Sequence, residues 1–224
     1  MAGTAPPAAS TVPHPRRPFD SGSECGRQWG RLRHWYENDL GWATVPAAPG
    51  EPLRLVTGGR FDVLEMPARA GVRALGRLAP GSPVALQGGR MRLLVAAGSA
   101  EELPGLLDWL EWGAPALDLD LRALGAGGAM DAPARPEPAV DGIRPPSVSA
   151  DGPGGPVQGA AVWLRPPESG CEVEASLPTL SAMGGVGGAP DLVRLVNTVA
   201  TECHRIRLRR AGRGPEGCQA LASS

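Results

Sequence analysis

Short apolar segments with helical spacing and with strand-like spacing alternate along residues 26–165 of this 224-residue chain. In the first segment, Trp29, Leu32, Tyr36 and Leu40 recur every three or four residues, the periodicity of a helix with one buried face. That spacing is more typical of core than of a platform for stacked bases. The alternation favours an α+β (mixed α/β) class, with helices packed on a sheet. The expected helices cover 26–40, 67–78 and 100–112, and the expected strands cover 42–46, 53–57, 61–65, 84–86, 91–96, 117–121 and 160–165.

Glycine and proline limit how much of the chain can belong to this domain. There are 32 glycines and 25 prolines, about a quarter of the residues, which approaches the range of partly disordered chains. We expect one core with flexible additions. The expected parts are a Pro/Ala-rich tail over 1–24, a core over 25–131, a Pro/Gly-rich linker or loop over 132–156, a strand and helix over 157–212 that complete the same domain, and a flexible tail over 213–224.

The basic residues exclude several chemistries. All 22 are arginine, and lysine is absent from the sequence, a bias that we attribute to a GC-rich genome. A phosphate-loop lysine, a Schiff-base lysine and a lysine general base are therefore excluded. The formal net charge of −1 creates no global attraction to nucleic acid or to an anionic membrane, so any such contact must be local.

The cysteines and histidines are scattered and lack the spacing of a zinc site. Cys203 and His204 are adjacent, but they fall in a helical stretch, and a buried free thiol is the better interpretation of Cys203. The first residues of the sequence contain no apolar region of the kind that a secretory signal has, and no apolar run in it reaches the length of a membrane span. We therefore expect a cytoplasmic protein with reduced thiols and no membrane partner.

Carboxylates stand in two of the expected strands: Asp62 and Glu65 in one, Asp118 and Asp120 in the other. A carboxylate at the end of an apolar strand is costly to bury unless something compensates it, and a divalent metal is a common compensation. The alternative is that each is a helix cap or a turn residue. Two residues apart, Asp118 and Asp120 would share one face of a strand, whereas Asp62 and Glu65, three apart, would not.

A basic strip follows the helix that Pro190 and Asp191 are expected to open. Its alternation with apolar residues fits an edge strand as well as a helix end. The strip either contacts phosphates or forms a solvated face. It consists of Arg205, Arg207, Arg209 and Arg210.

The order of five segments along the chain is informative: LGWATVP, FDVLEMPARAG, GSPVALQGGRMRLLV, LDLDLRALGAGG and VWLRPP. In this order, the chain resembles the bifunctional DNA primase/polymerase N-terminal family, part of the archaeo-eukaryotic primase-polymerase group, over residues 27–167. The resemblance implies a primase-polymerase-like sheet, in which Gly41, Trp42 and Pro46 match a strand after the first helix. It also implies two metal-binding carboxylates in an Asp-x-Asp strand, a nucleotide-contacting histidine in the hairpin, and a later aspartate before a Gly-rich turn.

The chain departs from the family pattern at the site itself. Asp62 and Glu65 replace the Asp-x-Asp pair, and Glu65 can join a metal site only if the strand bends before Pro67. The hairpin carries Arg90 and Arg92 instead of the histidine, which leaves these two as possible phosphate contacts. The family's early lysine has no counterpart. Two-metal nucleotidyl transfer needs about three converging carboxylates, more than this pattern supplies.

We therefore expect a divergent DNA primase/polymerase-like protein with a degenerate site, which binds nucleotides, single-stranded DNA or a protein partner. One alternative is an active DNA primase/polymerase that depends on Mg²⁺ or Mn²⁺. Another is a scaffold that acts through its Pro-rich segments. The residues of the active alternative are Asp62, Glu65 and Asp120 as catalytic groups, Asp62, Asp118 and Asp120 as metal ligands, and Arg90 and Arg92 as nucleotide-binding groups.

Overall fold

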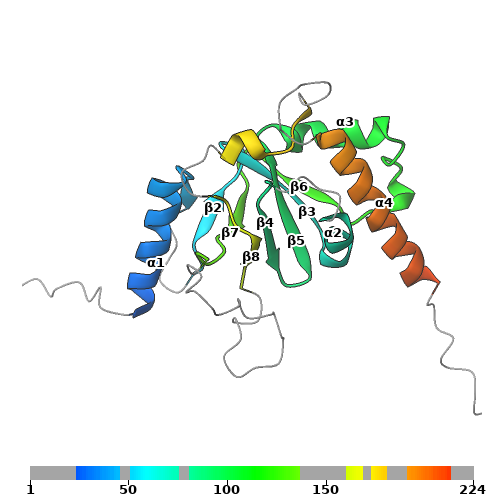
Figure 1. The fold of residues 1–224 in the computed structure, drawn as a ribbon. Coiled ribbons are helices and arrows are strands. Elements are labelled where there is room, and N and C mark those ends of the chain that lie inside the picture. The colour runs from blue at the N-terminus through cyan, green and yellow to red at the C-terminus, as the bar shows by residue number, and fades with distance from the viewer. Residues whose placement is uncertain are drawn as a thin grey trace, which may run out of the picture.

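The α+β class expected from the sequence is confirmed, with helices packed on antiparallel sheets (Figure 1). The computed structural model describes residues 24–45, 51–75, 81–136, 160–168, 173–180 and 191–212. The two expected tails, apart from residue 24, lie outside the described residues, as does most of the expected loop over 132–156.

A five-stranded antiparallel sheet forms the centre of the molecule. Its strand order is β6-β3-β5-β4-β8, so the two longest strands, β3 and β5, lie inside the sheet. The β4–β5 hairpin turns at Gly88, whose φ of 54° suits glycine. The strands are β3 (Phe61–Pro67), β4 (Val84–Gln87), β5 (Arg90–Ala96), β6 (Arg122–Leu124) and β8 (Val162–Arg165).

Two helices connect these strands in the split β-α-β order. Helix α2 (Ala68–Leu75) joins β3 to β4, and α3 (Ser99–Trp109) joins β5 to β6, which puts the first and third strands of the motif side by side. The last helix, α4 (Leu192–Ala211), begins at Asp191, whose side chain accepts hydrogen bonds from two backbone N–H groups of its first turn.

Helices α2, α3 and α4 cover one face of the five-stranded sheet (Figure 1). Leu64 and Met66 of β3 point into this core, where they join buried residues of all three helices. The helix after residue 190 thus completes the same core as the N-terminal part of the chain. Helical members of this core include Ala70, Ala74, Leu103, Leu106, Leu195, Val196 and Val199.

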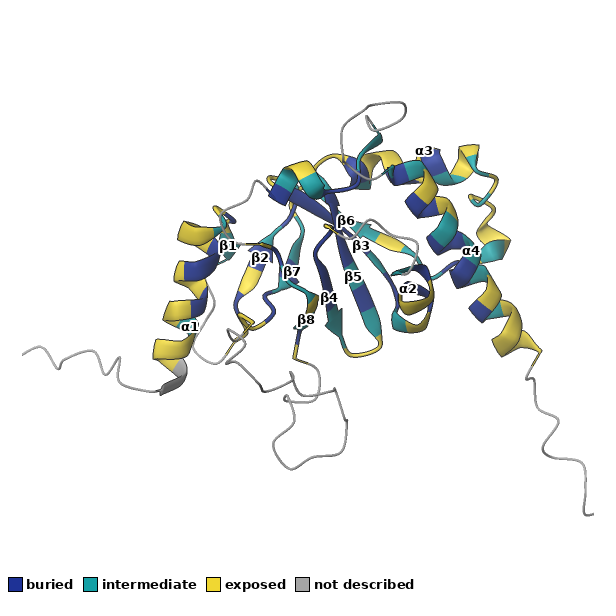
Figure 2. Cartoon of the chain, viewed as in Figure 1, coloured by how far each residue is buried: buried dark blue, intermediate teal, exposed yellow. Residues whose placement is uncertain are grey.

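The opposite face of the sheet packs at one end against a cluster of aromatic residues. Phe61 of β3 contacts Trp42 at 4.6 Å between ring centroids, and Trp42 stacks on Tyr36 at 6.0 Å. Tyr36 donates to the Pro133 carbonyl and accepts from Trp163 Nε1, so its hydroxyl is satisfied within the cluster. The expected core role of the aromatic stripe is confirmed by this packing (Figure 2).

A smaller sheet and the first helix complete this side of the molecule. The three-stranded antiparallel sheet has the order β1-β2-β7 and consists of β1 (Thr44–Val45), β2 (Arg54–Val56) and β7 (Ala129–Asp131). Helix α1 (Glu24–His34) continues into a π-helical turn, η1 (Trp35–Asp39). The expected helix over 26–40 is therefore present, with a wider last turn that buries Trp35 and Tyr36.

The strand expected over 117–121 is wrong. The short 3₁₀ turn η2 (Pro115–Leu117) ends there, and the next strand, β6, begins only at Arg122. Asp118 has a φ of 36° and Asp120 a φ of 55°, in the left-handed region that a strand cannot contain. Asp and Asn tolerate this region better than most residues, which makes the segment a turn.

The basic strip over 205–210 is helical rather than an edge strand, because α4 continues through it to Ala211. A second 3₁₀ turn, η3 (Val173–Ser176), lies between β8 and α4. Within the described segments, every helix is too short or too polar to cross a bilayer.

Candidate functional site

Asp62 lies on the helix-covered face of the sheet, where it serves helix α3. Its side chain is 1% exposed, and Oδ2 accepts a hydrogen bond of 2.9 Å from the Ala100 N–H in the first turn of α3. The N-cap residue of that helix is Gly98, which has no side chain to supply this acceptor. A carboxylate near a helix N-terminus is also favoured by the helix dipole. Asp62 thus performs the helix-capping role that we gave as the alternative to metal binding.

Glu65 points to the opposite face of the same strand and is held by two arginines of β5. Its Oε1 accepts from Arg90 Nε at 3.1 Å, and its Oε2 accepts from Arg92 Nε at 2.9 Å. The three side chains are only 13%, 26% and 16% exposed, respectively, so partial burial strengthens these contacts. Strand β3 is regular through Pro67, and it lacks the bend that would bring Glu65 to the side of Asp62.

Asp120 meets the other end of Arg90. Arg90 Nη1 donates to Asp120 Oδ1 at 2.6 Å, and Nη2 donates to the Asp120 carbonyl at 3.1 Å. The left-handed backbone of the turn places the carbonyl and carboxylate of one residue within reach of one guanidinium. Asp118 is exposed in the same turn; its N–H donates to the Pro115 carbonyl, and its carboxylate makes no hydrogen bond or ion pair within the described chain.

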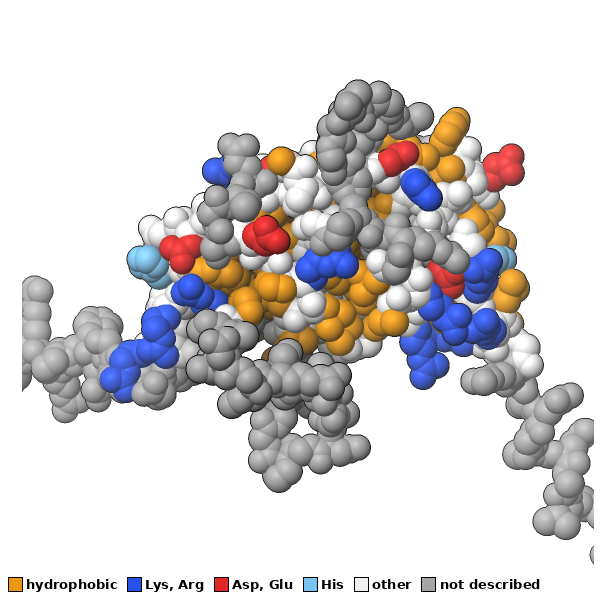
Figure 3. Space-filling model, viewed as in Figure 1, with side chains coloured by type: hydrophobic (Ala, Val, Ile, Leu, Met, Phe, Trp, Pro, Cys, Tyr) orange, Lys and Arg blue, Asp and Glu red, His pale blue; other side chains and the backbone are white. Residues whose placement is uncertain are grey.

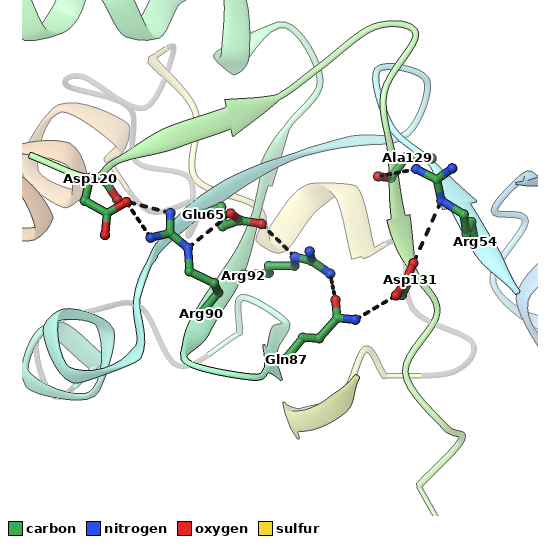
Figure 4. Close-up of polar contacts among 8 residues, drawn as sticks. All are labelled: Arg54, Glu65, Gln87, Arg90, Arg92, Asp120, Ala129 and Asp131. Carbon is green, nitrogen blue, oxygen red and sulfur yellow. Dashed lines mark hydrogen bonds and ion pairs between the residues drawn. The ribbon is translucent and has the colours of Figure 1, made fainter. Parts of the chain in front are cut away.

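The contacts continue in the other direction to residues that the sequence analysis did not single out. Arg92 Nη1 donates to Gln87 Oε1, and Gln87 Nε2 donates to Asp131 Oδ2 at 2.6 Å. The contact of Gln87 with Asp131 crosses from the five-stranded to the three-stranded sheet, and within the latter Asp131 also pairs with Arg54 Nε at 3.8 Å. The result is one continuous row of polar side chains, here called the ladder (Figure 4). Its members are Asp120, Arg90, Glu65, Arg92, Gln87, Asp131 and Arg54.

The missed members of the ladder leave only a weak signal in the sequence. Gln87 is one of them. It is the cross-strand partner of Arg90, and Arg90 and Arg92 lie two residues apart on one face of β5, so period-two spacing in the hairpin could have grouped Gln87 with the two arginines. Arg54 and Asp131 are paired in the register of β2 with β7, a pairing of strands far apart in the sequence. No local pattern indicates that contact.

Arg122 adds a further cation beside the ladder. It is the cross-strand partner of Glu65 in the register of β6 with β3, on the side opposite to Arg92. Directly paired residues of adjacent strands point to the same face. Arg122 is exposed and forms no ion pair in the described part of the chain. Four arginines and three carboxylates therefore lie along this surface.

The carboxylates of the expected metal site do not converge. Asp62 and Glu65 lie on opposite faces, Glu65 is bound by two guanidinium groups, and Asp120 is bound by one. The described segments contain no group of three or more His, Cys, Asp or Glu side chains arranged to hold a metal ion. The arrangement therefore does not fit the two-metal chemistry that the resemblance implies, which needs carboxylates on one side.

Cys203 is a buried free thiol, as expected from the sequence. Burial, with a smaller contribution from the nearby Asp120 carboxylate, raises its pKa to about 12. A thiol with so high a pKa is a poor nucleophile at neutral pH. The neighbouring His204 packs against the Trp112 ring at 5.7 Å between centroids, so the two adjacent side chains have separate environments.

Comparisons of this chain with protein-family models, with curated proteins and with solved structures found no significant match.

Proposed function

We propose that this protein is a non-catalytic, primase-polymerase-like module that binds single-stranded nucleic acid on the sheet face that carries the ladder. One observation carries the proposal: both carboxylate oxygens of Glu65 are bound by arginines, Arg90 and Arg92. A carboxylate in that position orients two arginines on the sheet face and is not available to a metal ion.

The proposal of a non-catalytic site follows from what each carboxylate contacts. Asp62 accepts from a helix N–H on the far side of the sheet, while Glu65 and Asp120 neutralise guanidinium groups. To hold Mg²⁺ or Mn²⁺, Glu65 would have to release two charged partners in a partly buried site, which is costly. The element order that prompted the resemblance is compatible with a fold that has lost this chemistry.

The arginines supply the reason for a nucleic-acid ligand. Arg90 and Arg92 are two residues apart on β5, so their side chains leave the sheet about 7 Å from each other. Planar guanidinium groups contact phosphates through paired hydrogen bonds and also stack on exposed bases. Arg122 is the strongest phosphate contact in this proposal because it is exposed and has no carboxylate bound to it in the described chain. A cytoplasmic location, which we expected because the sequence shows neither an apolar signal region nor a membrane-spanning run, belongs to the same proposal.

A primer assay tests the absence of catalysis. The intact protein and its Asp62→Ala variant are incubated with single-stranded DNA, Mn²⁺ and labelled nucleotides. We expect neither protein to synthesise or extend a primer while both remain folded by circular dichroism. Product from the intact protein alone would establish a working carboxylate site and would overturn the non-catalytic assignment.

A binding assay tests the ligand. Fluorescence anisotropy of a labelled single-stranded oligonucleotide is recorded over a salt series for the intact protein and for Arg122→Ala. Each lost phosphate contact lowers the slope of log K against log salt by about 0.7 for a single strand, and we expect this change with weaker binding. The matched control is Arg31→Ala, an exposed arginine of α1. Absence of binding by the intact protein, or equal loss in both variants, would reject the sheet face as the site.

A further inference from the structure

Helices α2 and α4 present the same short pattern to solvent. In α2, Arg69, Val72 and Arg73 are exposed. In α4, Arg205, Leu208 and Arg209 are exposed at the same spacing, an arginine followed three residues later by an apolar residue and a second arginine. Residues at i, i+3 and i+4 share one face of a helix. Val72 is 61% exposed and Leu208 56% exposed. We call these residues the basic surface: Arg69, Val72, Arg73, Arg205, Leu208 and Arg209.

The arginines of the basic surface have almost no internal counter-charge. Arg205 pairs with Glu202 at 2.6 Å, whereas Arg69, Arg73 and Arg209 form no ion pair in the described part of the chain. Because α2 and α4 pack against each other, the cations gather on one area of the molecule (Figure 3). A cluster of like charges with exposed apolar side chains beside it is typical of a protein-binding surface.

Helix α3 presents the complementary chemistry. Trp109 is 67% exposed, the most exposed large hydrophobic side chain among the described residues. Glu101, Glu102 and Asp108 are exposed on the same helix. Gly105, which has no side chain, is exposed between them one turn along. These four side chains are here called the acidic surface: Glu101, Glu102, Asp108 and Trp109.

The two surfaces lie on one layer of helices, the basic surface on α2 and α4 and the acidic surface on α3. Helix α4 contacts α2 and also α3, and all three cover the same face of the sheet (Figure 1). Within the described chain, no ion pair joins the acidic surface to the basic surface. A two-fold axis through this helical layer would therefore place each surface opposite its complement on another copy.

We propose that a second copy of this chain docks on the helical layer, with the acidic surface of each copy against the basic surface of the other. Such a contact is isologous and closes as a dimer. Tryptophan and arginine are the residues that contribute most to protein interfaces, and an arginine over the exposed Trp109 ring adds a cation–π attraction. This inference uses residues outside the ladder and does not depend on nucleic-acid binding.

A second copy accounts for more of these residues than a nucleic acid does. A nucleic acid would engage the arginines through its phosphates, but these offer no apolar group to Val72 and Leu208. The exposed carboxylates on the helix of Trp109 repel a polyanion. The acidic and aromatic side chains of α3 match both the charged and the apolar parts of the basic surface. Charge complementarity of this kind also selects the partner.

Sedimentation velocity of the full chain over a concentration series tests the proposal. We expect a monomer–dimer equilibrium that weakens as salt increases. Two charge-reversed variants, Arg69→Glu/Arg209→Glu and Glu101→Arg/Glu102→Arg, should each weaken the dimer by at least about tenfold. An equimolar mixture of the two variants restores both contacts and should recover a heterodimer. Circular dichroism checks that each variant is folded.

The control is Arg31→Glu/Arg33→Glu on α1, which makes the same change in charge outside the proposed interface. It should leave the dimer unchanged. A chain that stays monomeric at low salt would overturn the proposal, as would a dimer that survives both reversed variants or a mixture that does not associate. Binding of oligonucleotide lost only in Arg69→Glu/Arg209→Glu, with no dimer, would assign the basic surface to nucleic acid instead.

Discussion

Asp62 and Glu65 lie three residues apart on strand β3 and point to opposite faces of the five-stranded sheet. Asp62 caps helix α3 on one face, and Glu65 binds two arginines on the other. The regular strand between them keeps the two carboxylates apart, because successive side chains alternate across a sheet. This relationship is the main reason for proposing a binding function instead of metal-dependent catalysis.

The capping role of Asp62 predicts a stability effect that depends on hydrogen bonding. Asp62→Ala removes the acceptor for the Ala100 N–H and should lower the free energy of unfolding by about 1–2 kcal/mol. Asp62→Asn keeps an acceptor oxygen of the same shape and should cost less. Urea unfolding of the two variants measures the difference. Equal losses in both would show that the charge, not the acceptor, is what α3 requires.

The role of Glu65 predicts opposite effects on stability and on binding. Glu65→Gln releases Arg90 and Arg92 from their counter-charge, so single-stranded DNA should bind more tightly, with a salt slope steeper by about 0.7 for each arginine that reaches a phosphate. The free energy of unfolding should fall by about 1–2 kcal/mol, less than for a fully buried pair, because the arginines keep some solvent contact.

The control for Glu65→Gln is Asp39→Asn, which removes one exposed negative charge at the end of η1. Anisotropy titrations and urea unfolding of both variants provide the comparison. If the control tightens DNA binding as much as Glu65→Gln does, net charge explains the change and the two arginines do not.

Two helical glycines predict effects of opposite sign. A Cβ at Gly71 in α2 would lie 2.0 Å from Met91 Sδ and 3.0 Å from Met91 Cβ in a fully buried contact, whereas a Cβ at Gly105 in α3 would meet no atom within 4 Å. Gly71→Ala should lower the free energy of unfolding by about 1–3 kcal/mol through overpacking. Gly105→Ala should raise it by up to about 1 kcal/mol through better helix propensity.

Chemical unfolding of both alanine variants side by side measures these changes. Stabilisation by Gly71→Ala would mean that Met91 moves aside without cost, and that α2 does not pack on β5 as closely as the geometry indicates.

Burial of Cys203 and Tyr36 predicts a loss of stability at alkaline pH. Burial raises the pKa of Cys203 from 9.0 to about 12 and raises the pKa of Tyr36 above its ordinary 10.0. Above about pH 9, the unfolded chain loses these protons while the folded chain keeps them, so the free energy of unfolding should be constant below that pH and fall from pH 9 towards 12. Urea unfolding at a series of pH values measures the slope. Cys203→Ala should reduce the slope, and an unchanged profile in that variant would show that its thiol ionises freely in the folded protein.

Local periodicity predicted the helices and strands that have strong apolar patterns. The helix with Leu32 and Tyr36, the hairpin around Gly88 and the helix opened by Asp191 are all present. The segment over 117–121 was predicted incorrectly, because Leu117, Leu119 and Leu121 alternate as in a strand while the intervening aspartates adopt left-handed turns. Alternation of apolar and polar residues indicates which side chains face the core, and a turn can produce this alternation as well as a strand can.

The contacts within the ladder could not be predicted from local sequence patterns. Arg90 and Arg92 were recognised as candidate contacts, but their binding to Glu65 depends on the register of β5 with β3, and the contact of Arg54 with Asp131 depends on strands more than 70 residues apart. Register is determined by packing over whole strands and by the turns that join them, so no short motif reports it.

The sequence by itself determined the α+β class, the core residues of the helices, the exclusion of lysine chemistry and the separation of Asp62 from Glu65 by strand periodicity. Only the tertiary structure decided what the charged residues contact: which carboxylate caps α3, which one neutralises Arg90 and Arg92, and which arginines of α2 and α4 have no counter-charge among the described residues. The physical reason is that alternation and helical spacing depend on neighbouring residues, whereas the energy of a charge depends on the groups that folding brings within a few ångströms of it.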